Sequence, residues 1–377
     1  RSFAEILRDN ADLAAERRSE FSSILVEESK KLTNELRGLF DSLSQGRFGP
    51  SLETELPGEE VSEALYQGNN YFREIEEWAE DFRDDVLSAS TADKLPDSEA
   101  LACHLRRTFP EMGNLEASSS QKGSKTPPGF GTDPTSSCAK VPESSQRFKL
   151  LRRVAELYRT DGFDRLVREG DVSAGPAEDL YRRALTSYFA AAVMMPYEVF
   201  RQMARTWRHD LDALQAEFGA SYEQVCHRLT TLQRPGSQGV PFHYLRSDIA
   251  GNIDKKFSAS GLALPRFGGV CPLWNLHSSF MQRGQISMQL AVFPDNRRFI
   301  MLARSVQKPK AHYWDPEKLV SIVIGCDASF AHQLVYADGL DRNAAPAVPV
   351  GVSCKQCARH GCRHRAYPMH FAEKPAV

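Results

Sequence analysis

Residues 241–260 read PFHYLRSDIAGNIDKKFSAS, and in this stretch the apolar pattern changes from helical to extended spacing. Aromatic and β-branched residues flank Ala250-Gly251-Asn252, a sequence that is typical of a turn between two strands. We therefore predict a β-hairpin. Because the apolar patterns before Pro241 have helical spacing, this hairpin separates a helical part of the chain from a part that contains a sheet.

Further strand patterns follow the hairpin. Residues 288–306, MQLAVFPDNRRFIMLARSV, predict a second hairpin that turns at 294–296, and residues 318–326, KLVSIVIGC, predict a buried strand. We predict helices over residues 274–290 and 327–339. This order of elements favours an antiparallel sheet with helices on one face, which is typical of GAF- or PAS-like sensory modules.

The residues before the hairpin predict helices. Apolar side chains recur at helical spacing over residues 1–45, 59–87, 147–158 and 177–195 and onward to Gly219, and Ser221 is a candidate N-cap for a last helix. Residues 116–146 are rich in Ser, Gly, Pro and Thr and predict a loop. The predicted fold class is α+β. We predict an N-terminal helical region over residues 1–90, which favours a homodimer, a helical middle domain over 91–239 and an α+β domain over 240–377.

Composition limits the possible functions. The 377 residues carry a net charge of -2, with 41% hydrophobic and 25% charged residues, which is typical of a globular protein and unlike a chain that coats nucleic acid. No apolar run approaches the roughly 20 residues of a transmembrane helix, so we expect a cytoplasmic protein without a membrane partner. The chain begins at Arg1 rather than methionine, and we expect a fragment of a longer protein.

Residues 354–364, CKQCARHGCRH, bring three cysteines together: Cys354, Cys357 and Cys362. Three thiolates leave a tetrahedral metal ion or an iron–sulfur cluster one ligand short. The fourth ligand could be His364, which would suit zinc, or a distant cysteine. Cys271 lies in a Gly-Gly-x-Cys-Pro sequence whose backbone N–H groups favour thiolate charge, and Cys326 ends a predicted strand.

Basic and aromatic residues alternate in the predicted hairpin. Arg and Lys side chains can bind phosphates and aromatic rings can stack on a base, whereas the alternative is an ordinary solvated face. The residues that we single out as ligand contacts are Tyr244, Arg246, Lys255, Lys256 and Arg266.

The motifs of several enzyme classes are absent. The sequence has no HExxH or HxxEH for a metallopeptidase, no G-x-S-x-G for a serine hydrolase and no phosphate-binding glycine loop. We therefore predict that the chain is not an enzyme and has no catalytic residues.

Six long stretches, taken together, resemble the short-chain fatty acyl-CoA regulators, a family of bacterial transcription factors of propionate and acetate metabolism. These stretches are EEVSEALYQGNNYFREIEEWAEDF (59–82), ALTSYFAAAVMMPYEVF (184–200), HRLTTLQRPGSQGVPFHYLRSDIAGNIDKKFSAS (227–260), GGVCPLWNLH (268–277), IGCDASFAHQLVYADGLD (324–341) and PVGVSCKQCARHGCRHRAYP (349–368). The resemblance covers about residues 57–90 and 145–370.

The resemblance implies a DNA-binding helix-turn-helix, a degenerate ImmA/IrrE-like middle domain, a C-terminal region that senses a short-chain acyl-CoA and, in some members, an iron–sulfur cluster. We expect the helix-turn-helix to lie outside this chain. Leu185 occupies the position of a glutamate ligand of ImmA/IrrE-like peptidases, so peptidase activity is not expected. An apolar pocket for the acyl group could involve Phe189, Met194 and Met195.

With this resemblance we predict a [4Fe–4S] cluster held by Cys271, Cys354, Cys357 and Cys362, and acyl-CoA as the effector. Zinc is the alternative metal. A redox or structural-zinc sensor that does not bind coenzyme A is the alternative function.

Overall fold

The computed structural model describes residues 57–88, 95–109, 142–265, 269–310, 313–340, 346–355 and 357–367. The chain divides into two compact units, Arg1–Leu56 and Pro57–Val377, and all described residues belong to the second unit. The long helices expected over 1–45, and with them the basis for the expected dimer, lie outside the described residues. Arg266 also lies outside them.

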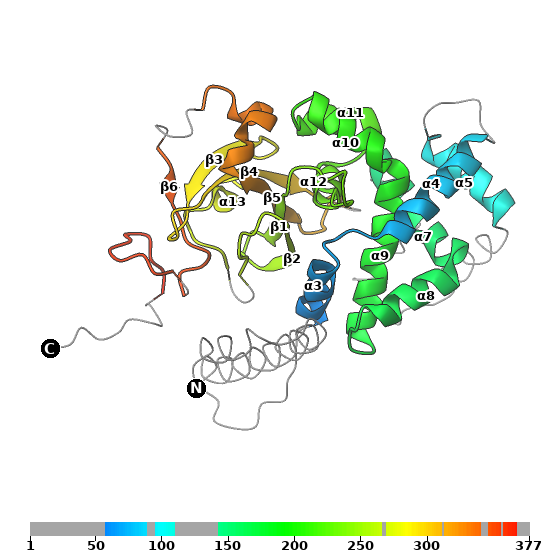
Figure 1. Ribbon diagram of the computed structural model, residues 1–377, viewed down its shortest axis with the longest axis horizontal. Coiled ribbons are helices and arrows are strands. Elements are labelled where there is room, and N and C mark those ends of the chain that lie inside the picture. The colour runs from blue at the N-terminus through cyan, green and yellow to red at the C-terminus, as the bar shows by residue number, and fades with distance from the viewer. Residues whose placement is uncertain are drawn as a thin grey trace, which may run out of the picture. The chain divides into compact units, whose positions relative to one another are not determined.

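The first part of the second unit is helical, as expected. Its described helices are α3 (Pro57–Gln67), α4 (Arg73–Ser88), α5 (Ser98–Thr108), α7 (Glu143–Tyr158), α8 (Thr160–Glu169), α9 (Pro176–Met194), α10 (Tyr197–Thr206), α11 (Leu211–Phe218) and α12 (Tyr222–Thr230). Helix α9 is the central one and contacts α3, α4, α7, α8 and α12 (Figure 1). Its last turns are buried all round, and the small side chains of Ala190, Ala191 and Ala192 allow neighbouring helices to approach closely.

Three expected boundaries in the helical part are wrong. The single helix over 59–87 is two helices, because Asn69 and Asn70 adopt positive φ angles of 51° and end α3. The helix that was expected to run on to Gly219 is likewise interrupted at Arg208 and His209, with φ of 48° and 57°. The loop over 116–146 ends earlier than expected, because α7 begins at Glu143.

The start of α12 agrees with the sequence. The Ser221 side chain accepts a hydrogen bond from the backbone N–H of Gln224, and the Gln224 side chain accepts one from the N–H of Ser221. This capping box satisfies two backbone donors at the helix end that faces the sheet.

The sheet confirms the α+β class. In the described part of the chain it has six strands in the order β2-β1-β5-β4-β3-β6 (Figure 1). The strands are β1 (His243–Asp248), β2 (Ile253–Ser258), β3 (Ser287–Val292), β4 (Arg298–Gln307), β5 (Leu319–Asp327) and β6 (Val348–Pro349). Both expected hairpins and the buried strand are present. The sheet is mixed rather than purely antiparallel, because β6 pairs parallel to β3.

Two helices predicted within the sheet part are wrong. Residues 274–290 contain only one helical turn, α13 (Asn275–Ser278), before the chain turns and enters β3. Residues 327–339 form the short 3₁₀ helices η1 (Ala328–Gln333) and η2 (Val335–Ala337). In both places short turns direct the apolar side chains onto the sheet. The helical spacing of these apolar residues therefore did not indicate an α-helix.

The two faces of the sheet contribute to different cores. One face, with Tyr244, Leu302 and Ile322, continues into the core of the helical part. The opposite face, with Leu245, Met301 and Val323, packs against Trp274 and other residues of the 270–276 segment and against Val350. Side chains that alternate along one strand therefore serve two separate environments.

Candidate functional site

The structure brings Cys271 to the cysteine-rich tail. The N–H of Cys271 donates to the carbonyl of Val352 at 3.0 Å, and the Trp274 indole donates to the carbonyl of Gly351 at 2.8 Å. Gly351 lies directly against Cys357, since a Cβ on it would be 2.6 Å from the Cys357 sulfur. Two segments about 80 residues apart in the sequence are thereby fixed side by side.

The electrostatics of Cys271 reflect this arrangement. Burial raises the pKa of its thiol, while hydrogen bonds from the backbone at Gly351 and Leu273 act in the opposite direction. The charges of Cys354 and Cys357 also act to raise this pKa. Among the described residues, however, no three His, Cys, Asp or Glu side chains lie close enough together to hold a metal ion.

The alternative fourth ligands differ in their location. Cys326 is buried in the core shared with the helices, on the opposite face of the sheet from Cys271. His364 is exposed, within the same tail as the three cysteines. The sheet itself therefore separates Cys326 from the tail, whereas Cys271 lies on the same side of the sheet as the tail.

Two arginines hold the tail in place. Arg365 donates to the carbonyls of Cys354 at 2.9 Å and Cys357 at 2.9 Å, and also to that of Arg359. Arg359 donates in turn to the carbonyls of Val350 and, across the sheet edge, Val292. These contacts anchor the backbone of the tail and place two guanidinium groups beside the cysteines.

The basic hairpin residues converge on a carboxylate that the sequence analysis did not single out. Glu223, in the first turn of α12, binds Arg246 from β1, Lys255 from β2 and Lys308 just after β4. Arg246 also binds Asp254. Burial works against ionisation of Glu223, but the charges of Lys255, Lys308 and Arg246 hold its pKa well below the usual value.

The other predicted contacts are separated from this group or buried beside it. Lys256 points to α3 and binds the carboxylate of Glu59 and the carbonyl of Pro265. Tyr244 is 1% exposed, its ring meets that of His227 at 5.8 Å, and its hydroxyl has no hydrogen-bond partner among the described residues. The ring of Tyr244 is part of the core, so the surface stacking role expected for it is not seen here.

A second polar group lies in the core of the helical part. Arg228 of α12 and Glu76 of α4 form an ion pair at 2.6 and 2.9 Å, with side chains 0% and 1% exposed. Glu76 also accepts from the Tyr188 hydroxyl at 2.6 Å, and Arg228 donates to the carbonyl of Met195. A sequence signal existed: each residue lies among apolar neighbours on the buried stripe of its own helix.

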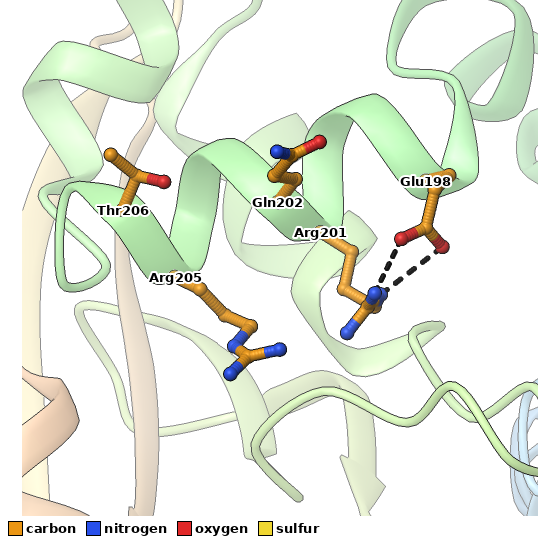
Figure 2. A pocket seen from close by; sticks show the side chains of 5 residues that line it. All are labelled: Glu198, Arg201, Gln202, Arg205 and Thr206. Atoms are coloured by element: carbon orange, nitrogen blue, oxygen red, sulfur yellow. Dashed lines mark hydrogen bonds and ion pairs between the residues drawn. The ribbon is translucent and has the colours of Figure 1, made fainter.

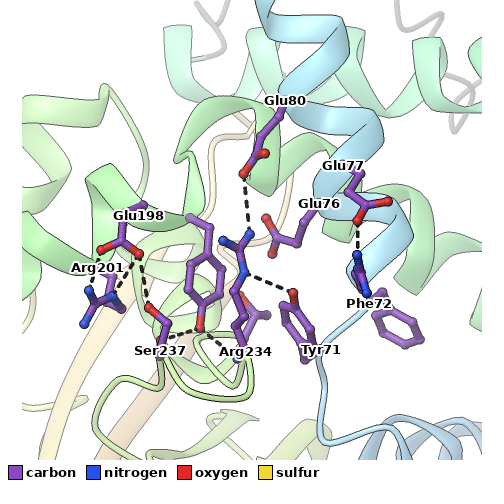
Figure 3. Close-up of polar contacts among 12 residues, drawn as sticks. Tyr71, Phe72, Glu76, Glu77, Glu80, Glu198, Arg201, Arg234 and Ser237 are labelled. Atoms are coloured by element: carbon purple, nitrogen blue, oxygen red, sulfur yellow. Dashed lines mark hydrogen bonds and ion pairs between the residues drawn. The ribbon is translucent and has the colours of Figure 1, made fainter.

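A more exposed network borders this pair. Figure 3 shows Arg234 between Tyr71 and Glu80, with its guanidinium 3.1 Å from the Tyr71 hydroxyl and 3.5 Å from the Glu80 carboxylate. Arg234 also lies over the Tyr197 ring at 4.2 Å. These contacts tie the loop after α12 to α4.

A depression of about 520 Å³ follows one face of α10 (Figure 2). It is lined by Glu198, Arg201, Gln202, Arg205 and Thr206. Arg201 is paired with Glu198, as the figure shows, whereas Arg205 has no ion-pair partner among the described residues. Its lining is polar, so this depression offers no apolar wall to an acyl group.

The residues suggested for an acyl pocket are core residues. Phe189, Met194 and Met195 are at most 3% exposed, and the Phe189 ring packs against Phe82 and Phe163. Leu185 is fully buried as well. The residue that we expected at the place of a peptidase glutamate is thus part of the apolar core.

Comparisons with known proteins agree with the resemblance. The short-chain fatty acyl coenzyme A regulator C-terminal model matches residues 231–374, and the IrrE N-terminal-like domain model matches residues 139–230. In the described part of the structure, no helix is long and apolar enough to cross a membrane.

The curated relatives are named as regulators. The HTH-type transcriptional regulator RamB of Mycobacterium tuberculosis is 36% identical over 83% of this chain and 66% of RamB. The propionyl-CoA carboxylase regulator of Cereibacter sphaeroides is 44% identical over 61% of this chain and 50% of that protein. PrpR of M. tuberculosis is 32% identical over 88% of this chain and 69% of PrpR. The chain therefore spans between half and about two thirds of these relatives.

A solved structure described as a Mycobacterium tuberculosis transcriptional regulator matches with a TM-score of 0.72 and 31% identity, over 85% of this chain and 96% of that one. None of these relatives is named as an enzyme, in agreement with the expectation from the missing motifs. The chain belongs to the short-chain fatty acyl-CoA regulator family.

Proposed function

We propose that this chain is the ligand-sensing region of a transcription regulator of short-chain acyl-CoA metabolism, and that it binds an acyl-CoA. The observation that carries the proposal is the match of the acyl coenzyme A regulator model to residues 231–374, which contain the whole sheet and the cysteine-rich tail. Basic side chains gathered at one end of this sheet are suited to the phosphates of coenzyme A.

DNA binding is proposed for a segment of the longer regulator outside this chain, because RamB and PrpR are named HTH-type regulators. An acyl-CoA that binds one arrangement of the sensing region better than another would shift the population toward that arrangement. In a cytoplasmic homodimer, this shift would change how two DNA-binding segments are presented to an operator.

Calorimetry on this chain tests ligand binding. Acetyl-CoA or propionyl-CoA should bind more tightly than free coenzyme A or the free acid, because the ligand would use both its phosphates and its acyl group. Lys255→Ala should weaken binding by roughly 1.5–3 kcal/mol if a charged hydrogen bond to phosphate is lost. A chain that binds none of these acyl-CoA compounds would refute the proposal.

We further propose that Cys271, Cys354, Cys357 and Cys362 hold an iron–sulfur cluster. Support comes from the segment that fixes Cys271 beside the tail, and from the arginines that place positive charge there. The thiols must draw closer together than they are here. When bound, such a cluster would supply a redox-sensitive cross-link between the 271 segment and the tail.

Metal analysis after anaerobic purification tests this assignment. We expect about four irons per chain, lost in Cys271→Ser and retained in the matched variant Cys326→Ser, whose sulfur lies across the sheet. Loss of iron in Cys326→Ser alone would make the fourth ligand wrong. Zinc without iron under these conditions would favour the zinc-sensor alternative.

A further inference from the structure

Three positively charged side chains surround a single carboxylate at the end of the sheet. Glu223 accepts from Arg246, from Lys255 at 3.2 Å and from Lys308, which come from three different parts of the fold. The Glu223 side chain is only 14% exposed and that of Arg246 15%, so the charges at the centre of the group are largely removed from water. The lysines are more open, at 49% for Lys255 and 32% for Lys308.

These cations share one face of the sheet. Arg246 of β1 lies opposite Lys255 of β2 in the strand register, and both side chains lie on the face of the sheet that α12 covers. Through β5, Arg246 lies in the same row as Arg304 of β4, because both residues are paired with Ile322. Basic side chains therefore lie at the border of the apolar part of this face, on both sides of Ile322.

The charges within the group do not balance. Among the residues that the structure describes, Arg246, Lys255 and Lys308 form ion pairs only with the carboxylates of Glu223 and Asp254, which leaves one excess positive charge. A third cation around one carboxylate adds repulsion between like charges. A phosphate group, with up to two charges and three terminal oxygens, matches three converging donors better than one carboxylate does.

An unused hydroxyl adjoins the group. Tyr244 precedes Arg246 by two residues on the same face of β1, and the charges of Glu223 and Arg246 act on its hydroxyl. That hydroxyl is buried and has no hydrogen-bond partner among the described residues. A buried hydroxyl without a partner is unfavourable, and this cost is recovered if a ligand oxygen accepts from it.

We propose that Arg246, Lys255 and Lys308 form a phosphate-binding site that Glu223 occupies in the absence of ligand. A phosphate or pyrophosphate group of the effector displaces the Glu223 carboxylate and takes its three donors. This inference builds on the proposed acyl-CoA function, but it names the phosphate subsite and the internal competitor for it.

Displacement of Glu223 would act on α12 as a whole. The same helix carries Arg228, whose guanidinium binds Glu76 of α4 in the core of the helical part. One face of α12 thus contacts the sheet through Glu223, and another face contacts the helical part through Arg228. Occupation of the phosphate site would be transmitted to α4 through a rigid two-turn helix.

The test uses pyrophosphate as the probe and compares three variants by calorimetry. Glu223→Gln removes the competing charge, so we expect pyrophosphate to bind about ten-fold more tightly than to the unchanged chain. Lys308→Gln should bind it at least about ten-fold more weakly. Asp212→Asn is the matched control, because Asp212 pairs with Arg304, which is not one of the three cations that bind Glu223, and the substitution should not alter the affinity.

Equal pyrophosphate affinity in the unchanged chain and in folded Glu223→Gln would refute the site. If Glu223→Gln does not fold, Lys308→Gln decides the question, because unchanged affinity in that variant refutes the site as well. Acyl-CoA separates the two proposals. Acyl-CoA binding that neither variant alters would retain the sensor function and reject this site. The expected pyrophosphate results without any acyl-CoA binding would retain the site and reject the acyl-CoA effector.

Discussion

The buried ion pair between Glu76 and Arg228 yields a quantitative prediction for Glu76→Gln. The substitution keeps the shape of the side chain but removes its charge, and leaves the Arg228 guanidinium buried without a counter-ion. The carboxylate accepts two hydrogen bonds from Arg228, at 2.6 and 2.9 Å, and one from Tyr188 at 2.6 Å. Charge-assisted bonds contribute roughly 1.5–3 kcal/mol each, and breaking a buried pair costs about 3–5 kcal/mol. We expect a loss of about 3–5 kcal/mol in the free energy of unfolding.

Urea unfolding followed by far-UV circular dichroism measures this loss. The matched control is Glu80→Gln on the same helix, whose half-exposed carboxylate holds Arg234 at 3.5 Å and should contribute less than about 1 kcal/mol. The double variant Glu76→Leu with Arg228→Met should be destabilised by less than the sum of its single variants, because no buried charge remains unpaired. A loss in Glu76→Gln no larger than that in Glu80→Gln would refute this reasoning.

Three further predictions concern the tail, α12 and the sheet. Gly351→Ala should displace Cys357, since the new Cβ would lie 2.6 Å from its sulfur, and should lower the iron content measured after anaerobic purification. Ser221→Ala should cost about 1 kcal/mol in urea unfolding, because the capping hydrogen bond to Gln224 is lost. Burial lowers the pKa of His243 to about 3, so the unfolded chain takes up the proton first as the pH falls below about 6.5. His243 alone should therefore contribute a loss of stability between pH 6.5 and 5 with a slope that approaches about 1.4 kcal/mol per pH unit, and His243→Gln should reduce the total slope by about that amount; an unchanged slope would contradict the assignment.

Some helix boundaries depend on local contacts and others on distant ones, and this explains why only some of them were predictable. Ser221 as a candidate N-cap indicated the start of α12 correctly, because capping of a helix depends only on local atoms. The break at Asn69 and Asn70 was missed. Asparagine tolerates positive φ without requiring it, and here Asn70 is held by a hydrogen bond to Thr230, 160 residues away.

The candidate site shows a similar division. Local chemistry was sufficient to single out the cysteine triplet and the basic hairpin, because thiolates and guanidinium groups have few alternative uses at that density. The residues that contact the basic hairpin could not be predicted from the sequence. Glu223 and Lys308 lie 23 residues before and 62 residues after Arg246, and neither has a local feature that points to it.

By itself, the sequence determined the elements with strong short-range signals: the two hairpins, the capped helix α12, the cysteine triplet and the family to which the chain belongs. The tertiary structure alone decided which distant groups meet. The Gly-Gly-x-Cys-Pro sequence favoured Cys271 over Cys326 as a ligand, but it did not show which of the two sulfurs can reach the tail. The sheet distinguishes them, because alternate residues of a strand project to opposite faces, and the two sulfurs belong to cores that the sheet separates.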